Sequence, residues 1–201
     1  MARKPADQTV QRRDVLFAAA AVFQERGYQG ATMADIAARL NLTAGSLYHH
    51  FPAGKSDLLL AVLNAGLDAV LEQVDRIIAE GLPPDETLRR LIEAHIVGIT
   101  ENQSIGAAMV FEIHTALDLT DDAEGREAFL HRRHEFEQRY RRVVERGIAD
   151  GIFRAVDVGI FTKAMLGAHN WVSVWYRPEG RLSGREIAAR MADLFLESLR
   201  Y

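Results

Sequence analysis

Residues 32–51, with the sequence TMADIAARLNLTAGSLYHHF, decide the fold of this 201-residue chain. Apolar residues at positions 33, 36, 37 and 40 form one stripe of a helix. Thr32 is expected to begin that helix, because its hydroxyl and the carboxylate of Asp35 can form the reciprocal hydrogen bonds of a capping box. The segment NLT then interrupts the pattern, and Thr43 can cap a short helix over about residues 44–50. Two helices joined by so short a turn predict a helix-turn-helix unit.

The second of these helices carries two kinds of side chain. Leu47 and Phe51 are four residues apart and are expected to face the core. Small residues at the start of the helix let its backbone approach a DNA major groove, where methyl groups can contact thymine and Tyr or His can donate to phosphates. An ordinary helical hairpin with an exposed tyrosine is the alternative interpretation. The predicted DNA-reading residues are Thr43, Ala44, Gly45, Ser46, Tyr48 and His49.

Helical periodicity continues along the rest of the chain. Apolar residues recur at three- and four-residue steps before Gly27, which is expected to end a first helix. No alternating strand pattern stands out, so the sequence predicts an all-α protein of about nine helices. We expect an N-terminal helix-turn-helix DNA-binding domain over residues 1–55 and a ligand-binding and dimerisation domain over residues 56–201. The helices expected after the first domain cover about residues 55–78, 84–102, 105–117, 124–150, 157–176 and 183–199.

The amino-acid composition narrows the class of protein. The chain has no cysteine, which excludes disulfides and thiolate metal sites and favours a reducing cytoplasm. The net charge is −4, yet residues 1–60 carry seven Lys and Arg against five Asp and Glu, so the N-terminal end is basic. No apolar run approaches the roughly 18 residues of a membrane span, and no signal peptide is visible. A cytoplasmic protein away from the membrane is therefore expected.

The sequence lacks the motifs of common enzyme classes. It contains no H-E-x-x-H, no G-x-S-x-G, no phosphate-binding loop and no dinucleotide fingerprint. His131 and His134 make a helix-borne metal site conceivable, but no paired Glu-x-x-His repeat supports it. We therefore expect neither catalysis, nor a cofactor, nor a bound metal. A purely structural DNA-bending protein is also disfavoured, because it would need a strongly basic surface.

The stretch GYQGATMADIAARLNLTAGSLYHHF, followed by Lys55 and the segment DLL, resembles the DNA-binding domain of the TetR family of bacterial transcriptional repressors. The resemblance covers about residues 12–60. It implies a homodimer whose two recognition helices read the half-sites of a palindromic operator, with residues 43–49 as the reading surface. It also implies that Thr32 and Lys55 lie on backbone phosphates near helix N-termini. The segment FPAGK has one residue more before the lysine than the common family pattern.

The last two predicted helices are the most apolar part of the second domain. The helix over residues 157–176 has apolar side chains on more than one face, and the helix over residues 183–199 adds another apolar stripe. A helix that is apolar nearly all round is buried on several sides, and the family resemblance implies a four-helix dimer interface here. The alternative is that both helices belong to the core of one protomer.

The segment HNWVSVWYRPEGRLS, residues 169–183, is similar to a narrower group of TetR-like regulators, which sense acyl-coenzyme A (acyl-CoA) thioesters in fatty-acid and cholesterol-ring catabolism. This similarity implies a repressor that an acyl-CoA effector releases from DNA. A drug-efflux regulator that responds to an aromatic or cationic compound is the alternative. The arginines of the helix over residues 124–150 can form a solvated face or bind coenzyme A phosphates. Helical patterning with polar interruptions gives the candidate pocket residues, which are His95, Ile99, Met109, Phe111, His114, Phe129, Arg133, Phe136, Tyr140 and Trp171.

Overall fold

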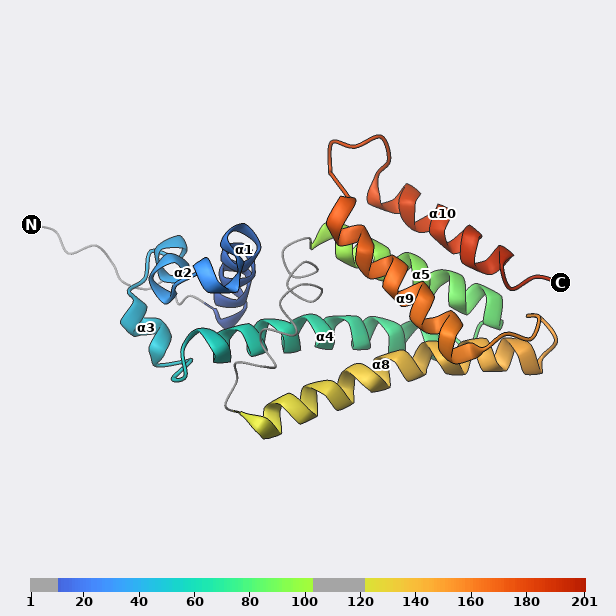
Figure 1. Ribbon diagram of the computed structural model, residues 1–201, viewed down its shortest axis with the longest axis horizontal. Coiled ribbons are helices and arrows are strands. Elements are labelled where there is room, and N and C mark those ends of the chain that lie inside the picture. Colours follow the sequence, from blue (N-terminus) through green and yellow to red (C-terminus); the bar gives the residue numbers. More distant parts are fainter. Residues whose placement is uncertain (1–10, 103–121) are drawn as a thin grey trace, which may run out of the picture.

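The computed structural model describes residues 11–102 and 122–201, and these residues form helices joined by loops, without a strand (Figure 1). The predicted all-α fold is confirmed. The helix predicted over residues 105–117 lies outside the described residues. The helices of the described residues are α1 (Arg12–Gly30), α2 (Met33–Arg39), α3 (Ala44–Tyr48), α4 (Lys55–Ala79), α5 (Pro84–Glu101), α8 (Ala123–Ala149), α9 (Val158–Trp175) and α10 (Gly184–Glu197).

Helices α1, α2 and α3 form a unit at one end of the molecule (blue in Figure 1), which we call the DNA-binding unit after the role that the sequence predicts for it. The first helix is interrupted at Gly27, whose φ of 65° lies in the left-handed region that glycine adopts without strain. Thr32 caps α2 in a capping box with Asp35, and Thr43 caps α3. The sequence predicted each of these caps correctly.

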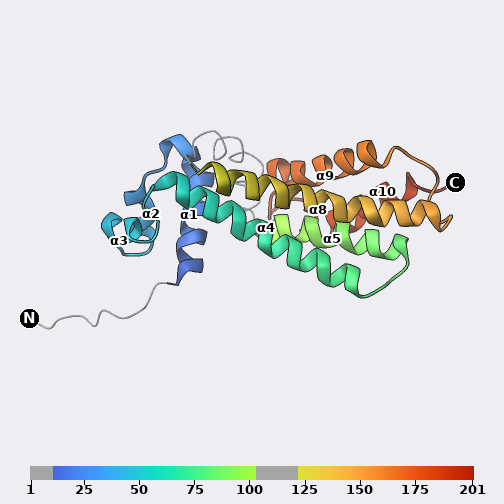
Figure 2. The same ribbon diagram turned by 90° about the horizontal axis from the view of Figure 1, so that it is seen from below.

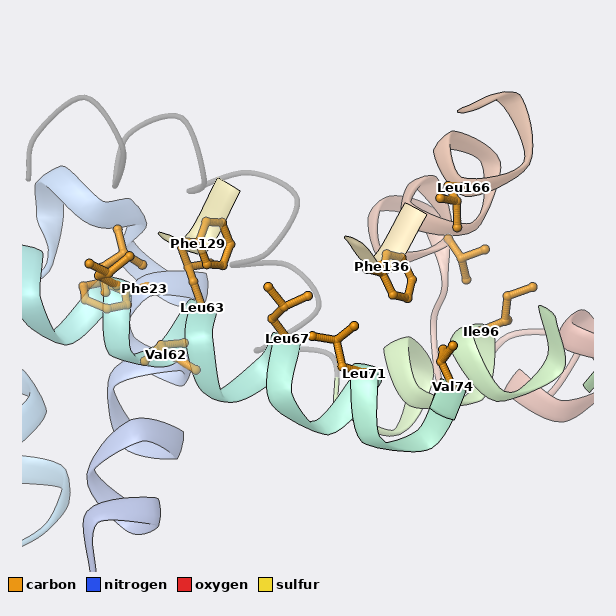
Figure 3. Packing of buried hydrophobic residues seen from close by; sticks show 14 of the residues in the cluster. Phe23, Val62, Leu63, Leu67, Leu71, Val74, Ile96, Phe129, Phe136 and Leu166 are labelled. Atoms are coloured by element: carbon orange, nitrogen blue, oxygen red, sulfur yellow. The ribbon is translucent and has the colours of Figure 1, made fainter. Parts of the chain in front are cut away.

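The core of the DNA-binding unit continues into the rest of the molecule, the C-terminal body. Leu47 is 1% exposed and Phe51 is 3% exposed, as predicted, and both belong to the same apolar cluster as Phe23. Figure 3 shows how α4 carries this cluster from Leu63, beside Phe23, toward Phe136 of α8. Because packed interiors transmit small displacements, α4 connects the two regions mechanically.

Helix α5 lies at the centre of the C-terminal body. It packs against α4, α8, α9 and α10, and α8 runs beside α4 in both views (Figures 1 and 2). Helix α10 packs mainly on α5 and meets α9 through the rings of Phe161 and Phe195, whose centroids are 6.0 Å apart. The outer sides of these two helices stay exposed, since Ile160 is 69% exposed and Leu194 is 65% exposed.

Within residues 11–102 and 122–201, no helix combines the length and the apolar character needed to cross a membrane. The same residues hold no group of three or more His, Cys, Asp and Glu side chains that could bind a metal ion. His131 and His134, whose spacing would suit a metal site on one helix, are both exposed on α8.

Candidate DNA-reading surface and effector cavity

The candidate DNA-reading surface is centred on α3. Thr43 accepts a hydrogen bond from the backbone N–H of Ser46 at 3.3 Å, and the hydroxyl oxygens of the two residues lie 3.0 Å apart. Both hydroxyls therefore take part in the helix cap, so a change at either residue will affect the start of α3 as well as any contact with a base. Ala44 and Ser46 are half-buried, and the exposed members of the predicted set are Thr43, Gly45, Tyr48 and His49.

The loop between α3 and α4 supports Tyr48. Gly54 has a φ of 74°, and a Cβ atom at this position would lie 3.2 Å from the ring carbon Cε1 of Tyr48. The tyrosine packs on this glycine and is still 49% exposed. Glycine fits this position of FPAGK because it adopts the left-handed backbone without strain and allows this close approach.

Lys55 has a structural role inside the DNA-binding unit. Its ammonium group donates to the backbone carbonyls of Tyr28 at 2.6 Å and Ala31 at 2.9 Å, and it lies 4.3 Å from the centre of the Tyr28 ring. These bonds satisfy carbonyl groups where α1 ends. The phosphate contact that the resemblance implies for Lys55 stays a prediction, and the geometry gives this ammonium group a different set of partners.

Thr32 is exposed at the N-terminus of α2. Its backbone N–H and its hydroxyl donate to the Asp35 carboxylate at 3.1 and 2.7 Å, and the Asp35 N–H donates back to the Thr32 hydroxyl at 3.1 Å. The hydrogen bond from the Thr32 hydroxyl, together with the charge of Arg26, lowers the pKa of Asp35. A helix N-terminus attracts anions, so the position of Thr32 is compatible with the predicted phosphate contact.

A cavity of about 630 Å³ opens between the DNA-binding unit and the C-terminal body. Its apolar wall comes largely from α4 and α5, with Leu67, Val70 and Ile99 among its residues. Helices α1, α8 and α9 complete the wall. The volume falls within the range of about 300–1,000 Å³ that is typical of small-molecule sites. We call this space the effector cavity, after the ligand site that the sequence predicts.

The effector cavity brings together part of the predicted pocket. Trp171 lies outside the described lining and is 58% exposed, because its neighbours His169 and Val172 occupy the inward face of α9. Phe129 and Tyr140 are fully buried in the core rather than in the wall. Met109, Phe111 and His114 lie outside the described residues. The predicted residues that line the cavity are His95, Ile99, Arg133 and Phe136.

The contribution of α1 to the cavity was not predicted from the sequence. Arg12, Arg13, Leu16 and Phe17 belong to its wall, and the guanidinium of Arg13 lies 5.2 Å from the centre of the Phe17 ring. The sequence assigned α1 to the DNA-binding domain alone. The signal available in the sequence was Phe17, a large apolar residue of α1. Its side chain is 38% exposed in the structure.

Arginines mark the polar part of the effector cavity. Most of the arginines on α8 pair with carboxylates, as Arg139 does by donating to both oxygens of Asp75 at 2.6 and 3.0 Å. Arg133, by contrast, lines the cavity together with Arg12 and Arg13 of α1. No Asp or Glu belongs to the lining among the described residues. The described wall is therefore suited to an anionic group.

Two histidines meet beside the cavity. His95 of α5 lines it, His169 of α9 is 0% exposed, and their Nδ1 atoms are 3.4 Å apart. Burial lowers the pKa of His95 to about 4, and burial together with the neighbouring His95 lowers the pKa of His169 further. Both rings are therefore neutral at pH 7. Sequence reasoning missed His169, although a histidine in a largely apolar helix is a visible signal.

Helices α9 and α10 expose large apolar side chains. Ile160, Trp171 and Trp175 of α9 are 69%, 58% and 48% exposed, and Leu194 of α10 is 65% exposed. Several large apolar residues on neighbouring helices are typical of an interaction surface. The inward faces of both helices do belong to the core of the protomer, as Met165 of α9 and Ala192 of α10 show, so the alternative accounts for one side of each helix.

Comparisons with known proteins agree with this architecture. Residues 15–62 match the bacterial regulatory proteins of the tetR family, and residues 81–199 match the Tetracyclin repressor-like, C-terminal domain. The chain belongs to the TetR family of transcriptional regulators. It is therefore a DNA-binding transcriptional repressor and not an enzyme.

Individual relatives are similar over almost the whole chain. The HTH-type transcriptional repressor KstR2 of Rhodococcus jostii (strain RHA1) is 32% identical over 206 residues, which cover 99% of this chain and 98% of the relative. The structure of the ketosteroid transcriptional regulator KstR2 of Mycobacterium tuberculosis aligns with a TM-score of 0.85 and 25% identity, covering 99% and 100% of the two chains. The crystal structure of AibR in complex with isovaleryl coenzyme A and operator DNA aligns with a TM-score of 0.77 and 29% identity, covering 93% and 96%. The predicted relationship to this part of the TetR family is confirmed.

Proposed function

We propose that this protein is a homodimeric repressor that binds a palindromic operator through two copies of α3 and is released by an acyl-CoA thioester bound in the effector cavity. The observation that carries the proposal is the composition of that cavity. Its wall combines an apolar surface with Arg12, Arg13 and Arg133, and it is built jointly by the DNA-binding unit and the C-terminal body. The protein would act in the cytoplasm, where operator DNA is found.

The division of roles on DNA follows from the chemistry of the exposed residues. Tyr48 and His49 carry polar groups that can donate to phosphates, while the small residues at the start of α3 let its backbone approach base edges. Thr32 adds a phosphate contact at the N-terminus of α2. Lys55 supports the surface by holding the end of α1 through the Tyr28 and Ala31 carbonyls. The proposed reading surface is Thr32, Thr43, Ala44, Gly45, Ser46, Tyr48 and His49.

The exposed apolar face of α9 and α10 supports the dimer. Side chains such as Trp175 and Leu194 are exposed to water in a single protomer. Burying them against a second copy would remove the unfavourable free energy of hydrating this apolar surface. We expect an interface of roughly 2,000 Å² or more in total, as is typical of obligate dimers. The boundary between residues 1–55 and 56–201 remains part of this proposal, with α4 as the connection.

The charges around the cavity favour an acyl-CoA over a cationic drug. Arginine binds phosphate through paired, charge-assisted hydrogen bonds, and Arg12, Arg13 and Arg133 are all available in the wall. A cation would face these three arginines without a compensating carboxylate among the described lining residues. The apolar part of the wall provides the environment that an acyl chain requires. The related protein AibR has been crystallised in complex with isovaleryl coenzyme A and operator DNA.

The position of the cavity suggests how binding would release DNA. An effector that touches Phe17 and Arg13 contacts α1 directly, and its contacts with α4 reach the helix that joins the two regions. The two recognition helices of a dimer must match the spacing of about 34 Å between successive major grooves. A small rotation of each DNA-binding unit would break that match. Release by about a hundredfold needs about 2.7 kcal/mol of differential affinity between the two conformers.

DNA footprinting of the region beside its own gene tests this function. We expect the protein to protect an inverted repeat, and protection to disappear when decanoyl-CoA is added. Decanoic acid should have far less effect, because it lacks the phosphates that the arginines would bind. Tetraphenylphosphonium, a hydrophobic cation, is the matched probe for the alternative. Release by this cation, with none by thioesters of any chain length, would replace the proposal with a drug-efflux regulator.

A further inference from the structure

The ring of His95 is held in one orientation at the wall of the effector cavity. It contacts Phe136 with ring centroids 5.5 Å apart at 78°, Tyr140 at 6.4 Å and His169 at 5.4 Å. The Tyr140 hydroxyl in turn donates to the Leu91 carbonyl at 3.1 Å. A polar group that several packed rings hold in place is preorganised to recognise a ligand, because little conformational freedom is lost on binding.

The contact between the two histidines constrains their hydrogens. Their Nδ1 atoms are 3.4 Å apart, and both rings are neutral. A neutral imidazole carries its hydrogen on one nitrogen and accepts on the other. For this contact to be a hydrogen bond, one of the two Nδ1 atoms carries a hydrogen and donates it to the other. His95 and His169 are thus in opposite tautomers.

The second nitrogen of His169 decides between the two arrangements. His169 Nε2 is fully buried and has no hydrogen-bond partner in the described part of the chain. A buried N–H without an acceptor is rarer in native proteins than a buried acceptor without a donor. The hydrogen of His169 therefore belongs on Nδ1, where it is donated to Nδ1 of His95. His95 then carries its own hydrogen on Nε2, and this atom is not among the fully buried, unpartnered ones.

We propose that His95 presents an Nε2–H donor to the effector cavity and that the effector must place a carbonyl oxygen against it. The inference rests on the proposed function, since it specifies the ligand of the same cavity. An imidazole N–H in an apolar wall loses its water partners when the cavity fills with hydrocarbon, and that loss is costly unless the ligand supplies an acceptor. His95 thereby selects acyl groups by their oxygen, while the remaining wall selects them by size.

The carbonyl oxygen has two possible sources, which are the thioester itself and a keto group farther along the acyl chain. Three probes separate them: decanoyl-CoA, its thioether analogue S-decyl-CoA, which has no carbonyl, and S-(4-oxodecyl)-CoA, a thioether with a keto group in the chain. All three carry the same coenzyme A phosphates. Differences among them therefore report on the oxygen alone.

Calorimetric titration of the full-length protein measures the selection. The wild type should bind one of the two carbonyl probes at least about tenfold more tightly than S-decyl-CoA, a difference of about 1.4 kcal/mol. His95→Phe keeps an aromatic ring beside Phe136 but removes the donor, so it should bind all three probes with the affinity of S-decyl-CoA. The control His131→Phe changes an exposed histidine of α8 and should retain the wild-type preference.

Each outcome discriminates between the two proposals. A preference for carbonyl probes that persists in His95→Phe overturns the role of His95, as does equal binding of all probes by the wild type. The second result would leave the acyl-CoA effector in place. Failure of the wild type to bind any probe would remove the effector proposal and this inference together.

Nuclear magnetic resonance of the wild type tests the tautomers without a substitution. Long-range correlations between imidazole carbon-bound protons and ring nitrogens distinguish an Nε2–H from an Nδ1–H imidazole. We expect the hydrogen on Nε2 in His95 and on Nδ1 in His169. The reverse assignment would leave His95 without a donor for the cavity and would overturn the inference, whatever the folding of the His95→Phe variant.

Discussion

The DNA-binding unit and the C-terminal body are both helical, but their functional contacts span very different distances along the chain. In the DNA-binding unit, Thr32 and Asp35 cap a helix from positions three residues apart. In the body, His95 meets His169 across 74 positions. The first kind of contact depends on neighbouring residues and the second on the packing of the whole bundle. The DNA-reading surface is therefore a local property of the sequence, whereas the effector cavity is a tertiary one.

Besides α4, a second helix takes part in both regions. Helix α1 carries Phe23 in the core of the DNA-binding unit and Phe17 in the wall of the cavity. A ligand that occupies the cavity therefore touches a helix that packs on α2, and α3 packs on α2 in turn. This shared helix is the physical basis of the proposed coupling, and variants that act on one region alone are the way to test it.

The largest effect on operator binding is expected from a substitution on the apolar face of α9 and α10. Leu194→Arg should convert the dimer into monomers and weaken operator binding more than about a hundredfold, because each half-site alone binds far less tightly. The protomer should still fold, since Leu194 is 65% exposed. Analytical ultracentrifugation measures the dissociation of the dimer, and circular dichroism shows whether the protomer is folded. Leu130→Arg, the same change at a leucine of α8 that is 43% exposed, is the control. A dimer that survives Leu194→Arg would place the interface elsewhere.

A substitution in the cavity should weaken ligand binding without affecting DNA binding. Gly98 lines the cavity, and a Cβ atom at this position would meet nothing within 4 Å. Gly98→Leu should therefore fill ligand space without a clash and weaken binding of decanoyl-CoA by about thirtyfold, or about 2 kcal/mol. Operator affinity should stay unchanged.

Ala128→Leu, on the exposed surface of α8, is the matched control for that measurement. Thermal unfolding shows whether the fold is intact, and Gly98→Leu should be at least as stable as the wild type, because glycine is a poor helix former. Unchanged binding of decanoyl-CoA by a folded Gly98→Leu protein would move the ligand out of this cavity.

In the DNA-binding unit, Tyr48→Phe should cause a smaller loss of affinity for DNA. The substitution keeps the ring that packs on Gly54 and removes the hydroxyl alone. We expect about tenfold weaker binding of the dimer, since it loses two solvent-exposed hydrogen bonds, one per protomer, that contribute about 0.7 kcal/mol each. Gel-shift titrations at fixed salt should show the same loss for operator and unrelated DNA. A loss confined to the operator would mean that Tyr48 reads a base rather than a phosphate.

The pH dependence of stability is the smallest expected effect near neutrality. The folded-state pKa of His95 is about 4, below its ordinary value of 6.5, and the pKa of His169 is lowered as well. Between these values the unfolded chain binds protons that the folded protein does not bind, so stability falls as the pH falls from about 6.5 toward about 4. From pH 6.5 to pH 5.5 the loss should be about 1 kcal/mol for each of the two histidines.

Urea unfolding of wild type and His169→Phe at both pH values isolates this contribution. The carboxyl groups with lowered pKa, such as Asp35 and Asp75, lose their stabilising ionisation only at lower pH, because their ordinary value is already 3.8. The variant should therefore lose less stability than the wild type over this interval. An equal loss in both proteins would mean that the histidines are not buried as a neutral pair.

The sequence predicted the DNA-binding unit in detail because its caps and turns are chosen by adjacent residues. It predicted only part of the cavity. Amphipathic spacing marks the inward faces of α5 and α8, which is why His95 and Phe136 were found. Helix α9 is apolar nearly all round, so periodicity could not tell that Trp171 faces outward. Nor could a local pattern show that Arg13 of α1 meets residues much later in the chain.

The most direct test of the coupling is operator affinity measured by fluorescence anisotropy, at fixed salt, with and without saturating decanoyl-CoA. The proposed mechanism predicts that the thioester weakens operator binding by about a hundredfold and, by reciprocity, that operator weakens thioester binding by the same factor. Thioester binding to the free protein with no change in operator affinity would contradict it. The effector cavity and the DNA-reading surface would then be independent sites on one fold.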